Sequence, residues 1–294
     1  MRSALKGLIV IIVILLVAFC VYAYFVGLQI KPAPAIPEKI VDDSKNIPVR
    51  KVIGLSVEGR KIESFTYGNG AKHLVFVGGI HGGYEWNSVL LSYKFIDYLE
   101  NNKGVIPDGL KVTVIPSVNP DGIYAVTKKD GRFTVADVSS DQKILASGRF
   151  NANDVDLNRN FDCKWKPKAT WQTKTTSAGS APFSEPEALA IKSFVSENNP
   201  DAFVFWHSQS NAVYASACED GILPGTIDIM NAYSKASGYP AVKTFDAYAV
   251  TGAVEDWLAS VKIPAITVEL KTHETIEWDK NLAGIKALFE YYRI

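Results

Sequence analysis

The hydrophobic and polar positions along the chain separate a long apolar segment near the N-terminus from a mixed remainder. Residues 8–28 form a run of 21 positions that carries no charge and in which only Gly27 is not apolar. At about 1.5 Å per residue, a helix of this length would span about 30 Å, the thickness of the hydrocarbon core of a bilayer. Arg2 and Lys6 precede the run, and positive charge tends to stay on the cytoplasmic side. Residues 1–28 are therefore expected to be a single-pass membrane anchor, with the rest of the chain outside the cytoplasm.

A cleaved signal peptide is the main alternative for this segment. Residues 18–20 (Ala-Phe-Cys) have the small–any–small pattern of a cleavage site, but the apolar run continues past them to Leu28. If the segment were cut, the remaining protein would be secreted. Three prolines lie within Lys31–Pro37 and favour an extended, semi-rigid spacer. We predict a Pro-rich linker at residues 29–48 and a globular domain at residues 49–294.

Within the globular part, short apolar runs alternate with helix-like stretches. The strand-like runs are residues 73–77, 112–115, 202–206 and 263–268. The helix-like stretches are residues 86–101, 185–198, 224–237, 253–261 and 279–292. This alternation predicts an α/β fold, a single domain with a mixed, largely parallel central sheet flanked by helices. Functional groups of such sheets gather at the carboxyl ends of the strands, which here are residues 78–81, 116–119, 207–208 and 269.

Composition narrows the class of protein. The chain has 294 residues, 47% of them hydrophobic, and its 31 basic residues balance 31 acidic ones. A chain of this kind can bury a core, which excludes disorder as its main state. Zero net charge argues against a general nucleic-acid binder. Composition does not indicate an oligomeric state.

Three cysteines are too few for a disulfide-dense scaffold. Cys163 and Cys218 both lie in the part of the chain expected to face outward, where an oxidising exterior permits a disulfide between them. Two free, buried thiols are the alternative.

Two histidines and a glutamate stand at strand ends and suggest metal chemistry. His81 follows the first strand-like run and lies four residues before Glu85, and glycines around it allow a sharp bend. His207 ends another run. Two histidines and one glutamate are the ligand set of hydrolytic zinc sites, in which a fourth position stays open for water. Spacing alone is weak support, because a loop histidine beside a solvated glutamate is the commoner arrangement.

Seven segments in one order strengthen this interpretation, because together they resemble the zinc metallocarboxypeptidases, the relatives of carboxypeptidase A. The segments are Gly54–Arg60, Asn119–Gly122, Val155–Phe161, Pro182–Glu187, His207–Ser208, Tyr248–Trp257 and Thr267–Glu269. The resemblance covers essentially all of residues 50–294. It implies a carboxypeptidase-like catalytic domain in a membrane-anchored or secreted protein of bacterial type.

The resemblance also implies a role for each polar residue near the strand ends. His81, Glu85 and His207 would hold one zinc ion per chain, and Asp156 would orient the first histidine through its second ring nitrogen. Glu269 would be the general base that takes a proton from zinc-bound water. One departure is that three residues separate His81 from Glu85, where the family usually has two.

On the substrate side, the resemblance assigns Asn158 and Arg159 to the free C-terminal carboxylate of a peptide, which a guanidinium can bind through both oxygens. Tyr248 would close over the bound end. Glu255 falls where relatives read the terminal side chain, and an acid there would favour Lys, Arg or the free amine of a peptidoglycan cross-linking residue.

The family also uses an arginine to stabilise the oxyanion of the reaction. Arg149, ten residues before Arg159, is the candidate in this sequence, and Arg132 is the second choice.

The sequence therefore predicts an extracytoplasmic zinc carboxypeptidase that acts on peptides and is held at the membrane by its N-terminal helix. A relative that cuts cell-wall peptides as an endopeptidase or amidase is the first alternative, and a related zinc acylase is the second. A non-catalytic peptide-binding module is an alternative of a different class. Such a module would be expected to lack Glu269 or a zinc ligand, and neither is missing here.

Overall fold

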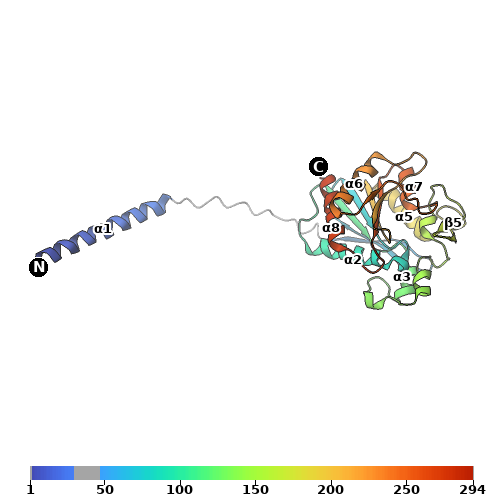
Figure 1. Ribbon diagram of the computed structural model, residues 1–294, viewed down its shortest axis with the longest axis horizontal. Helices are drawn as coiled ribbons and strands as arrows, with labels where there is room; N and C mark the ends of the chain where they lie inside the picture. Colours follow the sequence, from blue (N-terminus) through green and yellow to red (C-terminus); the bar gives the residue numbers. More distant parts are fainter. Residues whose placement is uncertain (1, 30–46, 294) are drawn as a thin grey trace. The chain divides into compact units, whose positions relative to one another are not determined.

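The computed structural model describes residues 2–29 and 47–293. It divides into two compact units, residues 1–41 and 42–294. In the first, helix α1 (Arg2–Gln29) contains the apolar run 8–28 (Figure 1). Over the residues that the structure describes, no helix is long and apolar enough to cross a membrane, so the predicted membrane span is not supported. Most of the predicted linker, residues 29–48, lies outside the described residues.

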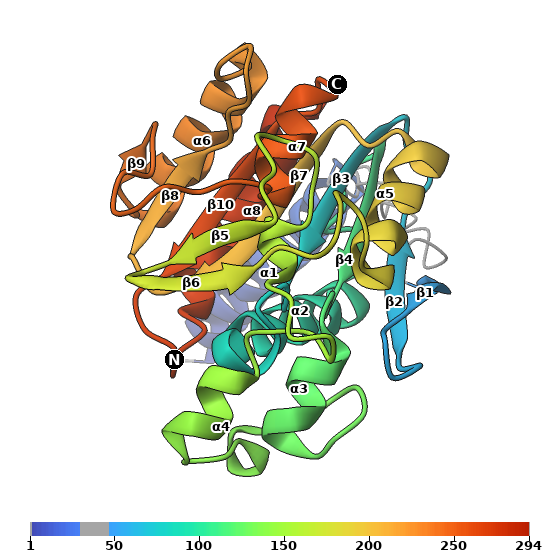
Figure 2. The same cartoon turned by 90° about the vertical axis from the view of Figure 1, so that its right-hand side faces the viewer.

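The second unit is built on an eight-stranded sheet with the order β1-β2-β4-β3-β7-β10-β8-β9 (Figure 2). The strands, in chain order, are β1 (Val49–Leu55), β2 (Lys61–Tyr67), β3 (Lys72–Val77), β4 (Leu110–Ile115), β7 (Ala202–Ser208), β8 (Ala212–Ala215), β9 (Ala241–Val242) and β10 (Ala265–Leu270). The four central strands β4, β3, β7 and β10 are all parallel to their neighbours in this group. The predicted mixed, largely parallel sheet is confirmed, and the four strand-like runs are its centre.

Helices cover both faces of this sheet. They are α2 (Trp86–Asn101), α5 (Pro186–Asn198), α6 (Pro224–Ser237), α7 (Val254–Ser260) and α8 (Trp278–Tyr291). The helices α3 (Pro120–Thr127) and α4 (Gln142–Ser147) lie beyond one end of the sheet, next to the turn after β3. One hydrophobic core joins α2, α6 and α8 to one face of the sheet, and a second joins α5 and α7 to the other. Alternate residues of β7 divide between the two cores, since Trp206 belongs to the first and Phe205 to the second. A strand buried on both faces is typical of parallel sheets and explains the continuous apolar runs in the sequence.

Shorter elements complete the domain. They are the 3-10 turns η2 (Gly82–Glu85), η3 (Val135–Asp137) and η4 (Leu157–Arg159) and the hairpin of β5 (Lys168–Trp171) and β6 (Lys174–Ser177).

The sequence motifs of the chain are tied to one another by buried hydrogen bonds. Asn119 caps α3 by accepting from the Gly122 N–H, and its side-chain amide donates to the carbonyls of Arg149 and Phe150. Asp121 accepts hydrogen bonds from the Ser56 hydroxyl and the Glu58 N–H. The contacts of Asn119 hold the segment that carries Arg149 at the start of α3, and those of Asp121 hold the turn after β1 there.

A disulfide joins Cys163 and Cys218, with an S–S distance of 2.08 Å and 55 residues between the two cysteines in sequence. It links the segment after η4 to the segment after β8. The remaining cysteine, Cys20, is free and exposed.

Thiol counting tests this disulfide. Denatured but unreduced protein should show one reactive thiol per chain, that of Cys20, and three after reduction. Because the bridge closes a loop of 55 residues, its removal in a Cys163→Ser/Cys218→Ser variant should cost up to about 4 kcal/mol of the free energy of unfolding. Three reactive thiols before reduction would contradict the disulfide.

Candidate active site

Two polar residues meet at the carboxyl edge of the sheet because of the register of β7 and β10. His207 and Glu269 are paired across these parallel strands. Their side chains leave the sheet on the face of α7, because the flanking residues Trp206 and Val268 pack in the opposite core. The strand pairing therefore brings together a predicted ligand and the predicted base, which are 62 positions apart in the chain.

The turn after β3 supplies the other two predicted ligands. His81 precedes the 3-10 turn η2, in which Gly82 has φ 45° and the Gly83 N–H donates to the Gly148 carbonyl. The left-handed conformation at Gly82 favours glycine, and a side chain there would also meet Gly148 O at 2.5 Å. This turn accommodates the extra residue between His81 and Glu85, so the departure in spacing does not separate the two side chains.

His81, Glu85 and His207 are buried together, and their ligand atoms all lie within 4.8 Å of one another. The His207 Nδ1 atom is 3.1 Å from Glu85 Oε2. Two imidazoles and one carboxylate are the donor set of hydrolytic zinc sites. Around this group, the buried atoms Glu269 Oε2 and Asp156 Oδ1 have no hydrogen-bond partner among the residues that the structure describes. The residues therefore fit a zinc ion.

Each histidine of the group also lies near a carboxylate that is not one of the three predicted ligands. Asp156 Oδ1 lies 3.5 Å from His81 Nδ1, and Glu255 Oε1 lies 2.9 Å from His207 Nε2. Metal-bound histidines commonly pass their other N–H to such a carboxylate, which fixes the tautomer and the ring angle. Asp156 was predicted in this position from the resemblance, whereas the contact of Glu255 with His207 was not.

The charges around the two histidines differ. Burial lowers the pKa of His81 well below its ordinary value, and the positive charge of Arg149 lowers it further. Burial also lowers the pKa of His207, but Glu85 and Glu255 outweigh it and hold that pKa well above the ordinary value. His81 is thus already in the neutral form that a metal requires, whereas His207 must lose a proton when a metal binds.

Glu269 is poised to hold a proton. It lines two cavities next to the three ligands, and its Oε2 atom is shielded from solvent. Burial and the charge of Glu85, opposed by His207, together raise the pKa of Glu269 to about 8. A carboxylate that accepts a proton this readily suits a general base near neutral pH.

Arg149 lies beside the ligand group, and Arg132 does not. The Arg149 Nε and Nη2 atoms are 3.0 and 2.9 Å from Asp156 Oδ2, and its Nη1 atom is 3.7 Å from Glu85 Oε1. Its guanidinium also stacks over the ring of Trp171 at 4.6 Å. Arg132 instead pairs with Asp97 at the surface. Of the two arginines, Arg149 therefore stays the candidate for the oxyanion role.

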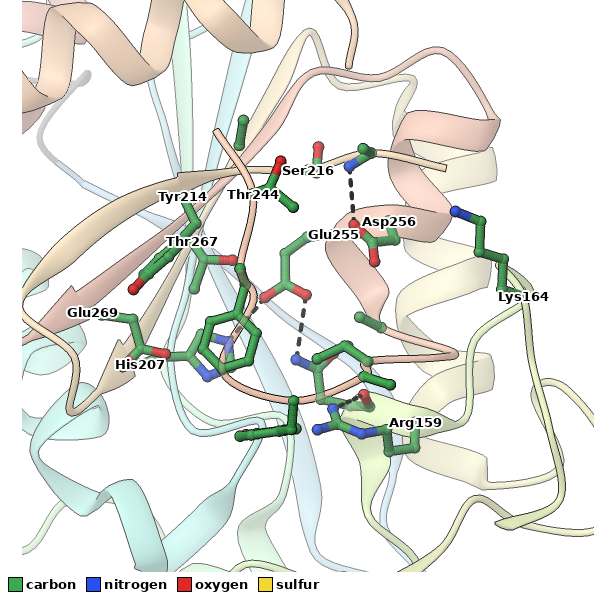
Figure 3. A pocket seen from close by; sticks show the side chains of 18 of the residues that line it. Arg159, Lys164, His207, Tyr214, Ser216, Thr244, Glu255, Asp256, Thr267 and Glu269 are labelled. Atoms are coloured by element: carbon green, nitrogen blue, oxygen red, sulfur yellow. Dashed lines mark hydrogen bonds and ion pairs between the residues drawn. The ribbon is translucent and has the colours of Figure 1, made fainter. Parts of the chain in front are cut away.

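The four residues predicted to bind substrate all line a cavity of about 320 Å³ next to His81 and His207. They are Asn158, Arg159, Tyr248 and Glu255 (Figure 3). Arg159 is buried and donates to the carbonyls of Asn158 and Thr170. The side chain of Asn158 is directed inward, since its Oδ1 accepts from the Val254 N–H and its Nδ2 donates to Glu255.

A second cavity of about 280 Å³ shares His81, Tyr248 and Glu269 with the first and contains residues that the sequence reasoning missed. His273 lines it, with its Nδ1 atom 2.7 Å from the hydroxyl of Ser208 and its ring against Tyr84. Trp171, from the hairpin β5–β6, also lines it. His273 lies four residues after Glu269 and so near the end of the same strand. This position could have indicated that His273 belongs to the site.

A comparison with family models identifies the class of protein that this fold and site define. The model described as zinc carboxypeptidase matches residues 38–283. The chain therefore belongs to the zinc carboxypeptidase family, a family of zinc-dependent peptidases, and the resemblance seen in the sequence is confirmed.

Relatives within the family differ in the bond that their names specify. The γ-D-glutamyl-L-diamino acid endopeptidase 1 of Lysinibacillus sphaericus is 27% identical over 243 residues, which cover 74% of this chain and 59% of that protein. The murein-tripeptide amidase MpaA of Escherichia coli O157 has a TM-score of 0.60 at 20% identity, with 83% of this chain and 92% of that chain covered. Carboxypeptidase A of Helicoverpa armigera has a TM-score of 0.63 at 18% identity, with 83% and 69% covered. The two structural similarities establish the fold.

Metal analysis tests the ligand group. Gently purified protein should contain about one zinc per chain, and a Glu85→Gln variant should contain much less because it loses the anionic ligand. Glu197→Gln, which alters an exposed glutamate of α5, is the matched control and should keep its zinc. A wild-type protein without zinc, or a Glu85→Gln variant that retains a full equivalent, would refute the site.

Proposed function

We propose that this protein is a zinc-dependent carboxypeptidase that removes the C-terminal residue of peptides. The observation that carries the proposal is the position of Arg159, buried at the cavity that contains His81, His207 and Glu269. A cation at this place suits the free carboxylate at the end of a peptide, with the last peptide bond next to the base. A non-catalytic binding module is less well supported, because Glu269 and the three metal ligands are all present and converge.

Zinc held by His81, Glu85 and His207 would supply a Lewis acid and make a bound water more acidic. Glu269 would accept the proton of the attacking water and pass it to the nitrogen of the departing amine. Arg149 would face the negative charge that develops on the carbonyl oxygen. Its guanidinium is held in advance by Asp156 and Trp171, and such preorganised charge is usually a large contribution to catalysis.

The guanidinium of Arg159 retains the donors needed to bind a carboxylate. Its Nε and Nη2 atoms donate to the Thr170 carbonyl and its Nη1 atom to the Asn158 carbonyl. Within the part of the chain that the structure describes, this leaves one N–H on each terminal nitrogen for a substrate. Two parallel donors are the geometry that binds both oxygens of a carboxylate. Tyr248, which lines both cavities, would cover the bound end.

The cavity beside Arg159 contains two further acids besides Glu269, together with Lys164 and Lys243, and these acids support a preference for basic terminal residues or for the free amine of a diamino acid. Glu255 and Asp256 both line it. Asp256 uses one oxygen to accept from the Ala217 N–H, and Figure 3 shows its other oxygen directed away from that bond. Burial raises the pKa of Asp256 to about 6, so it is still largely charged at neutral pH.

Cleavage of cell-wall peptides as an endopeptidase or amidase is a second candidate. It is favoured by the names of two proteins similar to this chain, a γ-D-glutamyl-L-diamino acid endopeptidase and a murein-tripeptide amidase. In that case the cavity beside Arg159 would receive the diamino acid, and recognition of a free C-terminal carboxylate by Arg159 would matter less.

We also propose that the domain works outside the cytoplasm. The disulfide between Cys163 and Cys218 supports this, because disulfides persist mainly in oxidising compartments. Attachment to a membrane through residues 1–28 stays a prediction from the sequence.

Replacement of the base tests the chemistry. Glu269→Gln should lower kcat by about 10³-fold, because the amide cannot accept a proton from the attacking water. The variant should keep its zinc, since Glu269 is not among the three ligands. Turnover at the wild-type rate would remove Glu269 from this role.

A panel of peptides that differ only at the C-terminus tests the substrate. Amidation of the terminal carboxylate should abolish cleavage, because Arg159 then loses its anionic partner, and peptides that end in Lys or Arg should be cut faster than those that end in Glu. Cell-wall peptides belong in the same panel. Equal rates on free and amidated peptides would favour the endopeptidase and overturn the carboxypeptidase assignment.

A further inference from the structure

The carboxylate of Glu255 is occupied on both sides by residues of the active site. Its Oε1 atom is 2.9 Å from His207 Nε2, and its Oε2 atom accepts from Asn158 Nδ2 at 3.3 Å. The residue is buried, with 4% of its surface exposed. Figure 3 shows the side chain descending from α7 to these two contacts. A glutamate engaged in this way is poorly placed to bind a substrate amine as well.

We propose that Glu255 is a positioning residue, which holds the metal ligand His207 and the substrate-side residue Asn158 in one arrangement. The proposal rests on the proposed zinc site and extends it. Glu255 would then support the catalytic centre and would not bind the terminal side chain of the substrate. Asp256 would be the acid that binds that side chain.

The contacts of His207 explain why a carboxylate is needed here. The imidazole lies between two acids, with Nδ1 at 3.1 Å from Glu85 and Nε2 at 2.9 Å from Glu255. When Nε2 carries its proton toward Glu255, Nδ1 presents a lone pair on the side of Glu85 and His81. An acceptor of fixed position therefore selects the tautomer that can bind a metal, and its negative charge makes the ring a stronger ligand.

The contacts of Asn158 extend the same arrangement to the substrate side. The Asn158 side chain joins two successive residues of α7, because its Oδ1 accepts from the Val254 N–H while its Nδ2 donates to Glu255. The Asn158 carbonyl in turn accepts from Arg159 Nη1 at 2.6 Å. One chain of hydrogen bonds thus runs from His207 through Glu255 and Asn158 to Arg159.

The two histidines are supported from different elements of the fold. Asp156, behind His81, precedes the turn η4 and is held by Arg149. Glu255, behind His207, belongs to α7, which packs on the sheet through Val254 and Leu258. Asp156 and Glu255 are thus held by different contacts, and each supports one histidine. The loss of one carboxylate is therefore not compensated by the other.

The test measures zinc affinity by competition with a chelator, starting from metal-free protein. Glu255→Gln keeps the shape and a hydrogen-bond acceptor for His207 but loses the charge, and we expect zinc to bind about 10-fold more weakly. Glu255→Ala loses both, and about 100-fold is expected. Glu187→Gln is the matched control, because Glu187 is a buried glutamate of α5 bonded to Asn151 and to the Val57 N–H, outside the ligand group.

Cobalt supplies a second readout that a general loss of stability would not move. In the cobalt-loaded protein, both Glu255 variants should shift the visible absorption bands, whereas Glu187→Gln should leave them unchanged even if it lowers Tm. If Glu255→Ala fails to fold, the isosteric Glu255→Gln still gives both measurements.

Zinc affinity within about 2-fold of wild type in the folded Glu255 variants, with unchanged cobalt bands, would overturn the positioning role. An equal loss of affinity in Glu187→Gln would overturn it too, since the effect would then be general. Failure of the proposed function has a different signature, in which wild-type protein binds zinc tightly and cleaves no peptide.

Discussion

The constraint on which this active site depends is a shortage of positive charge in a buried place. Four carboxylates and two guanidinium groups gather at the carboxyl ends of the central strands. The acids are Glu85, Asp156, Glu255 and Glu269, and the bases are Arg149 and Arg159. With neutral histidines and all four acids ionised, these six side chains carry two net negative charges, which one zinc ion would offset. Asp256, Lys164 and Lys243 line the adjoining cavity as well. Carboxylates removed from water without compensation are costly, and they respond by taking up protons. Burial and the charge of Glu85 raise the pKa of Glu269, and Glu85 and Glu255 raise the pKa of His207 against the effect of burial.

The fold concentrates these charges by simple means. The four central strands are parallel, so their carboxyl ends and the turns after them meet at one edge of the sheet. Buried side chains then hold the loops at that edge in place. Asn119 fixes the segment of Arg149, and the hairpin β5–β6 contributes Thr170 and Trp171 against the two arginines. Several motifs that mark the family in the sequence thus hold the residues of the site in position and need not contact a substrate themselves.

Much of this could be predicted from the sequence. The central strands are continuous apolar runs because both of their faces are buried, and they stand out for that reason. The four strands outside the centre, β1, β2, β8 and β9, were missed. β1 is largely exposed, β2 mixes buried and partly exposed positions, and β8 and β9 have only four and two residues. The hairpin β5–β6 was missed as well, since its strands have four residues each.

Within the site, residue types pointed to the ligands, the base and the arginines, but not to the direction in which each side chain extends. Glu255 illustrates this limit. Its place beside Asp256 predicted contact with a substrate, whereas the first turn of α7 directs its carboxylate to His207 and Asn158. Orientation within a short helix depends on how that helix packs, and packing is a property of the whole domain. His273 reaches the second cavity for a similar reason, through a loop that Ser208 holds.

The central claim, that the buried charges require a divalent cation, is tested most directly by counting the protons that zinc displaces. Calorimetric titration of metal-free protein with zinc at pH 7.5, in buffers of different ionisation enthalpy, gives this number. The account predicts release of at least one proton per zinc, because His207 and Glu269 hold protons until the metal arrives. Two histidines with ordinary pKa values would release only about 0.2 proton at this pH. Zinc binding with no more release than that would contradict the account.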